Sequence, residues 1–222
     1  NKAIEALQKV IQIDSKHSDA YYNLGNAFKQ LRDFKNAKKH YEKAILLQPR
    51  NSRALNNLGN ILKELGDLKN AIKTYNRAIQ IQPNHARSFH NLGNVYKQLG
   101  EFEKAKDSYR QAYKYQPSNL ETLDTLCVLD EKILDINLKK KIKEIMSIKN
   151  ITKKDIAYGN FLLAKYELKQ KNFEGEFEYL LKGHSNYFDF RKKAFEIGVK
   201  YWLHDLPKIE DLMNYGQSNN KK

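Results

Sequence analysis

The chain has 222 residues, of which 41% are hydrophobic, and this is enough for one or two domains with an apolar core. Its formal net charge of +14 suggests a polyanion such as nucleic acid as a partner, although a lysine-rich solvated surface accounts for the same charge. The sequence contains no apolar run of about 18 residues, which excludes a membrane-spanning helix. Its single cysteine, Cys127, excludes an intrachain disulfide and fits a reducing compartment, so we expect a cytoplasmic location.

The N-terminal segment, residues 1–17, predicts one amphipathic helix. Ala3, Leu7, Val10 and Ile11 recur at helical spacing. The segment carries an acidic residue and no long apolar block, so we do not expect a secretory signal. Ala3 aligns with Ala37 of the repeat described next, and residues 1–17 are therefore interpreted as the second helix of an incomplete repeat.

Residues 18–119 contain the same unit three times. The phrase Asn23-Leu24-Gly25-Asn26 returns as Asn57-Leu58-Gly59-Asn60 and again as Asn91-Leu92-Gly93-Asn94, and Pro49, Pro83 and Pro117 keep the same step. A fixed period of this length is typical of stacked supersecondary units, each of which buries its apolar face against its neighbours. The sequence thus predicts a helical solenoid.

Each unit predicts two helices joined by a tight turn. In the first unit they run from Ala20 to Leu31 and from Phe34 to Leu47, and Pro49 stops the second helix. Glycine closes the first helix in the second and third units, whereas Arg32 stands at that place in the first, where we expect a slightly altered turn. Gly25 and its two counterparts lie mid-helix, where glycine is unfavourable, so we expect two helix backbones to approach too closely for a Cβ atom.

Seven positions of this unit carry a resemblance to the tetratricopeptide repeat. They are Leu24, Gly25, Phe28, Ala37, Tyr41, Ala44 and Pro49, then Leu58, Gly59, Leu62, Ala71, Tyr75, Ala78 and Pro83, then Leu92, Gly93, Tyr96, Ala105, Tyr109, Ala112 and Pro117. The resemblance covers about half of the chain. It implies an all-α fold, a right-handed superhelix of helical hairpins that acts as a non-catalytic protein-protein interaction module.

After Leu120 the repeat pattern decays. Residues 120–150 predict a decayed repeat and a basic helical hairpin, with a helix from Leu138 to Met146 that Asn137 caps. Residues 151–222 predict a divergent repeat with C-terminal capping helices. Its elements are a helix from about Lys153 to Gln170 with Thr152 and Asp155 as a capping box, a helix from Phe173 to Gly183, a longer helix through Phe188 and Trp202, a break near Pro207, a short helix around Ile209 to Met213, and a polar tail.

The order of these C-terminal parts is similar to the region that joins repeats to catalysis in bacterial tetratricopeptide-repeat sulfotransferases. The similarity rests on residues 161–167 and 177–183, and Glu176 and His184 depart from the pattern. No phosphate-binding strand-loop-helix for a sulfonate donor follows within the chain. The resemblance implies a substrate-recruiting arm of a longer enzyme.

The candidate binding residues lie on the first helix of each repeat, opposite the packing stripe. In the tetratricopeptide family this face lines the concave groove, and here it carries Asn23, Asn26, Lys29, Arg53, Asn57, Asn60, Lys63, Arg87, Asn91, Asn94 and Lys97. Asparagine side chains can pair with a peptide backbone, and the lysines favour acidic residues. The arrangement resembles the asparagine ladder of O-GlcNAc transferase, which implies that it holds polypeptide. Alternatively, these asparagines cap or bridge adjacent repeats.

A free C-terminal carboxylate is not the expected ligand. The chaperone-binding version of this fold holds one with two lysines, two asparagines and an arginine. Asn26, Asn57 and Arg87 match three of these places, but Tyr22 replaces a lysine and Asn91 replaces the arginine.

Catalytic signatures are absent from the sequence. Cys127 falls on an apolar helix face, His17 and His85 fall in inter-repeat turns, and no histidine pair has the spacing of a metal site. No glycine-rich phosphate loop is present. We therefore expect no catalytic residue, no metal and no cofactor.

Three functional hypotheses remain. The first is a non-catalytic module that holds an extended polar or acidic peptide in the groove, without a membrane partner. The second is the substrate-recruiting arm of a sulfotransferase-like enzyme, and the third is a basic scaffold that binds RNA or another polyanion. The sequence does not identify the peptide or the oligomeric state.

Overall fold

The computed structural model describes residues 2–204, with side chains from residue 2 to residue 192, and over this range it is all-α. No strand occurs among these residues, which confirms the predicted fold class. Within this range no helix combines the length and the apolar character that crossing a membrane requires. The chain divides into two compact units, residues 1–134 and residues 135–222.

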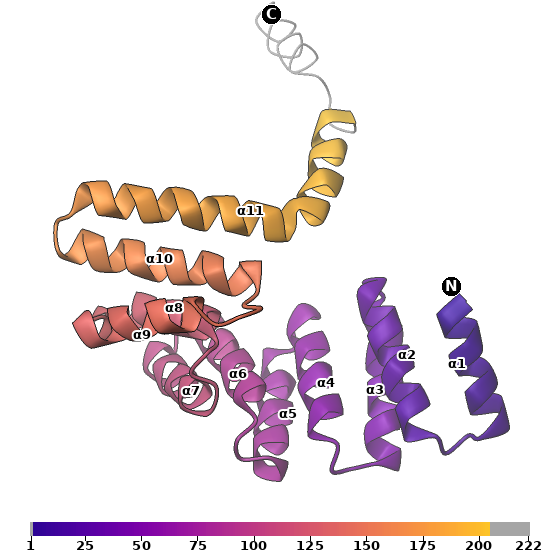
Figure 1. Ribbon diagram of the computed structural model, residues 1–222. Helices are drawn as coiled ribbons and strands as arrows, with labels where there is room; N and C mark the ends of the chain where they lie inside the picture. Colours follow the sequence, from indigo (N-terminus) through magenta and orange to yellow (C-terminus); the bar gives the residue numbers. More distant parts are fainter. Residues whose placement is uncertain (1, 205–222) are drawn as a thin grey trace, which may run out of the picture. The chain divides into compact units, whose positions relative to one another are not determined.

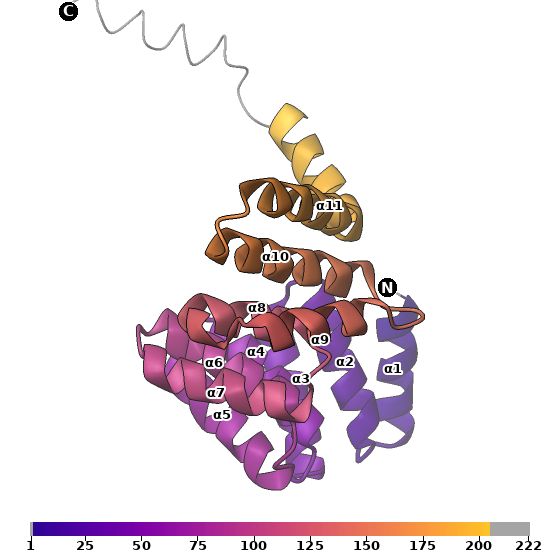
Figure 2. The same ribbon diagram turned by 60° about the vertical axis from the view of Figure 1, so that its left-hand side comes forward.

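The first unit is a row of helical hairpins that follow one another side by side (Figures 1 and 2). It consists of α1 (Lys2–Ile13), α2 (Ser18–Gln30), α3 (Phe34–Leu47), α4 (Ser52–Glu64), α5 (Leu68–Ile81), α6 (Ala86–Gln98), α7 (Phe102–Tyr115), α8 (Leu120–Leu129) and a 3-10 turn (Glu131–Ile133). The pairs α2–α3, α4–α5 and α6–α7 are the three predicted repeats, and α1 is the predicted extra second helix.

Polar side chains start most of these helices. Each one accepts a hydrogen bond from a backbone N–H in the first turn, and the residues that do so are His17, Asp33, Asn51, Asp67, His85 and Asn119. The hydrogen bonds formed by Asp33 and Asp67 with the asparagines three residues later hold the pKa of both carboxyls below the usual range. The acidic residue that follows each turn, Asp33, Asp67 or Glu101, is therefore the residue directly before the second helix of its hairpin.

The turns inside the hairpins all contain a residue in the left-handed region. Gly66 and Gly100 have φ of 80° and 76°, and Arg32 has φ of 58°. In the first turn the backbone N–H of Asp33 donates to the carbonyl of Phe28 at 2.9 Å, the Schellman bond that also closes the other two turns. Arg32 thus adopts the backbone of a glycine, and the expected alteration of this turn is wrong.

The core of each hairpin is organised around one tyrosine. Tyr41, Tyr75 and Tyr109 are completely buried, and each ring lies against a glycine of the first helix. A Cβ atom built on Gly59 would lie 2.5 Å from Cε1 of Tyr75, inside the closest contact that real Cβ atoms make. The mid-helix glycines are therefore required by a close approach, as predicted, but the partner is a side-chain ring and not a second backbone.

The end of the first unit departs from the repeat. α8 buries Leu123, Leu126 and Cys127, so the cysteine is a packing residue as predicted. After Asp130 the chain forms only the 3-10 turn, whose Ile133 packs against the cluster around Tyr109 and Leu126. No second helix completes this hairpin within residues 2–134.

The second unit comprises α9 (Ile136–Met146), α10 (Lys153–Lys169) and α11 (Phe173–His204). Two predictions are wrong here. Asp135, and not Asn137, caps α9, because its Oδ1 accepts from the N–H of Leu138 at 2.8 Å. The two helices expected between Phe173 and Trp202 are one continuous helix, since no glycine or proline between them interrupts the backbone hydrogen bonds strongly enough. The expected break at Pro207, the last helix and the tail lie outside the described residues.

α10 and α11 form a hairpin whose packing reverses that of the repeats (Figure 1). Its glycine, Gly183, is on the second helix and meets the ring of Phe161 on the first, with a Cβ-to-Cε1 distance of 2.5 Å. Thr152 caps α10 as predicted, with the Thr152 hydroxyl accepting from the Asp155 N–H at 3.0 Å. Residues 153–204 thus form a helical hairpin whose contacting residues are exchanged relative to the repeats, and the divergent repeat over residues 151–222 stays a prediction.

Candidate functional site

The central candidate site is the row formed by Asn26, Asn60 and Asn94 on α2, α4 and α6. Each side chain is half-buried, and each Oδ1 atom accepts a hydrogen bond from the tyrosine hydroxyl 15 residues later. The donor-acceptor distances are 2.8 Å for Tyr41, 2.7 Å for Tyr75 and 2.7 Å for Tyr109.

These hydrogen bonds fix which atom each asparagine presents. Burial raises the pKa of all three tyrosine hydroxyls, so each remains protonated and has a hydrogen to donate. Each amide oxygen therefore accepts at least one hydrogen bond, and that of Asn26 accepts a second one from Asn57, while the Nδ2 groups of Asn26, Asn60 and Asn94 form no hydrogen bond with any described residue. The row consequently presents N–H donors, at one per repeat.

A second set of amides links the hairpins to one another. Asn57 is 8% exposed, and its Nδ2 donates to the Tyr22 hydroxyl at 3.3 Å and to Oδ1 of Asn26 at 3.0 Å. One repeat later, Nδ2 of Asn91 donates to Oδ1 of Asn56 at 3.0 Å. The buried hydroxyl of Ser88 donates to the same oxygen at 3.2 Å. For Asn57 and Asn91 the bridging interpretation therefore describes the observed contacts.

Cations flank the asparagine row. Lys29 is half-buried, and burial together with the nearby charge of Arg87 lowers its pKa. Arg53, Arg87 and Lys97 are exposed and form no ion pair with a described residue, whereas Lys63 lies 3.3 Å from Glu64. Asn23, the remaining predicted residue, is exposed and also has no hydrogen-bonding partner in this part of the chain.

The sequence analysis missed the role of the tyrosine hydroxyls. Tyr41, Tyr75 and Tyr109 belong to the repeat pattern and fill the core. The available signal was the constant spacing of 15 residues between each asparagine and its tyrosine, repeated three times. A spacing cannot show that a hydroxyl at the end of a buried ring reaches across the hairpin.

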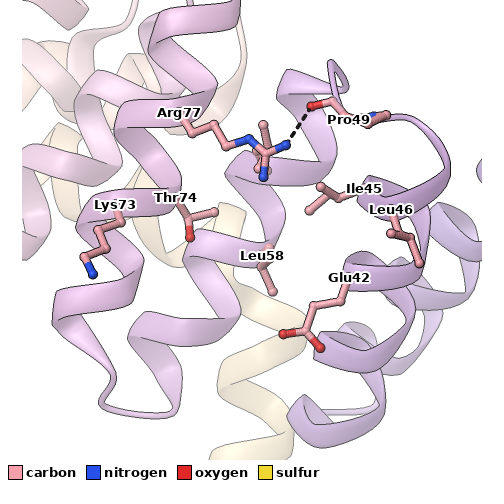
Figure 3. A pocket seen from close by; sticks show the side chains of 9 residues that line it. Glu42, Ile45, Leu46, Pro49, Leu58, Lys73, Thr74 and Arg77 are labelled. Carbon is pink, nitrogen blue, oxygen red and sulfur yellow. Dashed lines mark hydrogen bonds between the residues drawn. The ribbon is translucent and has the colours of Figure 1, made fainter.

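A cavity of about 480 Å³ opens on the side of the second helices, between α3 and α5 (Figure 3). Its apolar walls come from Ile45 and Leu46 on α3 and from Leu55 and Leu58 on α4. Polar side chains stand around it: Glu42 on α3, and Lys73, Thr74 and Arg77 on α5. The sequence analysis did not identify this cavity.

The hairpins and their shared face define the molecule as a helical solenoid with a polar row on its first helices. Tetratricopeptide-repeat models match residues 1–32, 18–51 and 50–118, which together exceed half of the chain. The chain therefore belongs to the tetratricopeptide-repeat proteins. No cluster of three or more metal-binding side chains is found in the described part of the chain. A comparison with curated proteins finds no match.

Solved structures share this fold at low sequence identity. PilF of Pseudomonas aeruginosa is 22% identical with a TM-score of 0.63, over 84% of this chain and 86% of that one. MamA is 17% identical with a TM-score of 0.51, over 85% of this chain and 89% of MamA. The tetratricopeptide-repeat domain of Arabidopsis OM64 is 21% identical with a TM-score of 0.50, over 51% of this chain and 94% of that domain. These similarities establish the solenoid fold.

Proposed function

We propose that the face formed by α2, α4 and α6 binds an extended polar or acidic polypeptide segment. Tetratricopeptide-repeat proteins generally mediate protein-protein interactions, and their stacked repeats form extended binding surfaces. The segment would lie across the three helices, with Asn26, Asn60 and Asn94 donating to its backbone carbonyl groups or carboxylates.

The observation that supports this proposal is the uniform chemistry of the row. Each asparagine oxygen already accepts a tyrosine hydroxyl, whereas none of the three Nδ2 groups is used by a described residue, so the row offers mainly N–H donors. Lys29, Arg53, Arg87 and Lys97 add cations, and a donor next to a cation binds a carboxylate more strongly than a neutral acceptor. The cations disfavour a basic ligand.

Packing geometry limits the length of the segment. Adjacent packed helices lie about 8–10 Å apart, so α2 and α6 are separated by roughly 20 Å. An extended chain advances about 3.3 Å per residue, and about six residues therefore span the row.

Two of the predicted contact residues are assigned a different role in this proposal. The Nδ2 group of Asn57 donates to Tyr22 and Asn26, and that of Asn91 donates to Asn56. In this proposal the two residues therefore position the row and do not contact the segment. Asn23 remains a contact residue because it is exposed.

The test is the replacement Asn60→Asp, measured with a fluorescein-labelled hexa-aspartate peptide by fluorescence anisotropy. Aspartate keeps the oxygen that accepts from the Tyr75 hydroxyl but replaces the Nδ2 donor by a second acceptor. We expect the fold to be retained and the affinity for the peptide to fall at least about tenfold, the effect of about 1.4 kcal/mol from one lost charge-assisted hydrogen bond. Alanine is a poorer choice, since it would leave a buried tyrosine hydroxyl without an acceptor.

The matched control is Asn76→Asp, which makes the same change of charge on the exposed face of α5. We expect it to change the affinity by less than about twofold, because the charge is distant from the row. If the two variants lost affinity for the peptide equally, the asparagine row would not be the binding site, and the peptide would bind through net charge alone. A labelled single-stranded oligonucleotide that binds more tightly than the peptide, with a steep salt dependence, would favour the polyanion hypothesis instead.

The sulfotransferase-arm hypothesis remains a prediction. The matched family models describe repeats only, and the solved structures named above share the repeat fold.

A further inference from the structure

The cavity between α3 and α5 is lined by two residues that are smaller than their aromatic counterparts in the first hairpin. In the first hairpin Tyr21 and His40 lie at these positions, and their rings stack with centroids 6.1 Å apart. One repeat later, Leu55 and Thr74 take their places and line the cavity. The side chains at these two places are therefore smaller in the second hairpin than in the first.

The third hairpin shows that the first of these positions normally carries a ring. Phe89, the counterpart of Leu55 in that hairpin, stacks on Tyr115 with centroids 5.8 Å apart. The position of Leu55 therefore carries an aromatic side chain in both the first and the third hairpin. In the second hairpin the smaller Leu55 stands where the other two hairpins place the rings of Tyr21 and Phe89.

The lip of the cavity carries an exposed leucine. Leu46 is 70% exposed, whereas the corresponding positions in α1 and α5 carry Gln12 and Gln80. An engineered cavity of about 150 Å³ is large enough to bind benzene. The cavity here, at about 480 Å³, has room for a larger aromatic side chain.

The charges around the cavity favour an acidic neighbour for that ring. On the α5 wall, Lys73 forms no ion pair with a described residue, and Arg77 donates one hydrogen bond to the carbonyl of Pro49 at 3.3 Å (Figure 3). The carboxylate on the opposite wall, Glu42, lies 3.8 Å from Lys38 of its own helix. The α5 wall therefore carries two cations that form no ion pair with a described residue, although the charge of Lys73 acts on Asp67 at the start of the same helix.

We propose that this cavity is a second docking site, which accepts an aromatic side chain of a partner polypeptide with an acidic residue next to it. The ring takes the place that Tyr21 and His40 fill in the first hairpin, between Leu46 and Leu55. The carboxylate pairs with Lys73 or Arg77. The lining of this site comes mainly from α3, α5 and the α4 residues Leu55 and Leu58, and it includes no residue of the asparagine row.

The test uses 3-phenylpropionate, which combines a phenyl ring with a carboxylate, titrated into the methyl-labelled full chain and followed by NMR. For a ligand of this size we expect a Kd on the order of 1 mM. The supporting result is a saturable shift of the methyl signals of Ile45, Leu46, Leu55 and Leu58. Propionate, which lacks the ring, should not produce these shifts, and 3-phenylpropanamide, which lacks the charge, should bind more weakly than the acid.

Two variants separate the site from non-specific binding. Leu55→Tyr with Thr74→His restores the residues of the first hairpin and should abolish the shifts, at least a tenfold loss in affinity. Lys73→Gln should weaken binding of the acid several-fold and leave binding of the amide unchanged. If the filled variant does not fold, Leu46→Gln, which restores the residue of the neighbouring repeats at an exposed position, should reduce binding at least about threefold.

Three results would overturn the proposal. One is the absence of saturable shifts at ligand concentrations well above the expected Kd. Another is a set of shifts confined to residues outside the cavity. The third is a folded Leu55→Tyr, Thr74→His variant that still binds 3-phenylpropionate with unchanged affinity or, if that variant does not fold, a Leu46→Gln variant that does so.

Discussion

The replacement Gly59→Ala tests how the repeat is held together. The added Cβ atom would lie 2.5 Å from Cε1 of Tyr75 and 2.8 Å from Cδ1 and Cζ of the same ring. The ring cannot turn aside freely, because its hydroxyl donates to Oδ1 of Asn60 at 2.7 Å and its side chain is fully buried. One methyl group therefore perturbs both the core and the asparagine row.

The expected loss follows from three contributions. Alanine is better than glycine in a helix interior by about 1 kcal/mol, which favours the variant. Overpacking a filled core costs about 1–3 kcal/mol, and a weakened hydrogen bond to Asn60 costs about 1 kcal/mol. We expect Gly59→Ala to lower the free energy of unfolding by about 1–3 kcal/mol.

The assay is urea denaturation of the full chain, followed by far-ultraviolet circular dichroism. A double-mutant cycle with Tyr75→Leu isolates the contact: without the ring the alanine should cost nothing or stabilise the helix, so the two changes should couple by at least about 1 kcal/mol. A Gly59→Ala variant as stable as the original chain, or additive effects in the cycle, would refute the reasoning.

Two further predictions concern a turn and an ion pair. Arg32→Gly removes the side chain from a residue with φ of 58° and loses the contact of the guanidinium with the Phe34 ring, whose centroid lies 5.7 Å away. We therefore expect the free energy of unfolding, measured by urea denaturation, to rise by about 0.5–1 kcal/mol. A lower free energy of unfolding would refute the argument that Arg32 is strained. In the second unit, the hydrogen bond from Lys139 at 2.7 Å lowers the pKa of Glu167 below its ordinary 4.5, with a smaller contribution from Asn172. The ionised pair therefore contributes stability above pH 4.5 that is lost as the pH falls through the folded-state pKa, and Glu167→Gln should flatten this part of the stability-pH curve; parallel curves for the two chains would contradict this.

The sequence alone determined the architecture of the first unit. The repeat period, the prolines and the apolar stripes placed three hairpins and an extra second helix, because each of these signals acts through local backbone geometry or through contact with the next copy of the same unit. The glycines were also interpreted correctly as sites of close approach. Only the structure showed that the approaching group is a tyrosine ring.

The sequence was less informative where the repeat ends. It predicted two helices in place of α11 and the wrong cap for α9, since neighbouring polar residues such as Asp135 and Asn137 are both good caps. At Arg32 it predicted an altered turn, although hydrogen bonds from the following residues enforce the left-handed backbone regardless of the side chain.

The chemistry of both proposed binding surfaces was decided by tertiary structure. All the asparagines of the first helices carry the same hydrogen-bonding groups, but the Nδ2 groups of Asn57 and Asn91 are used between hairpins while those of Asn26, Asn60 and Asn94 form no hydrogen bond with a described residue. The reason is that a side-chain amide has few hydrogen-bonding groups, and which of them is free depends on partners that are distant in the sequence. The cavity has the same origin: small residues at positions 55 and 74 leave space only because the helix packing brings them together.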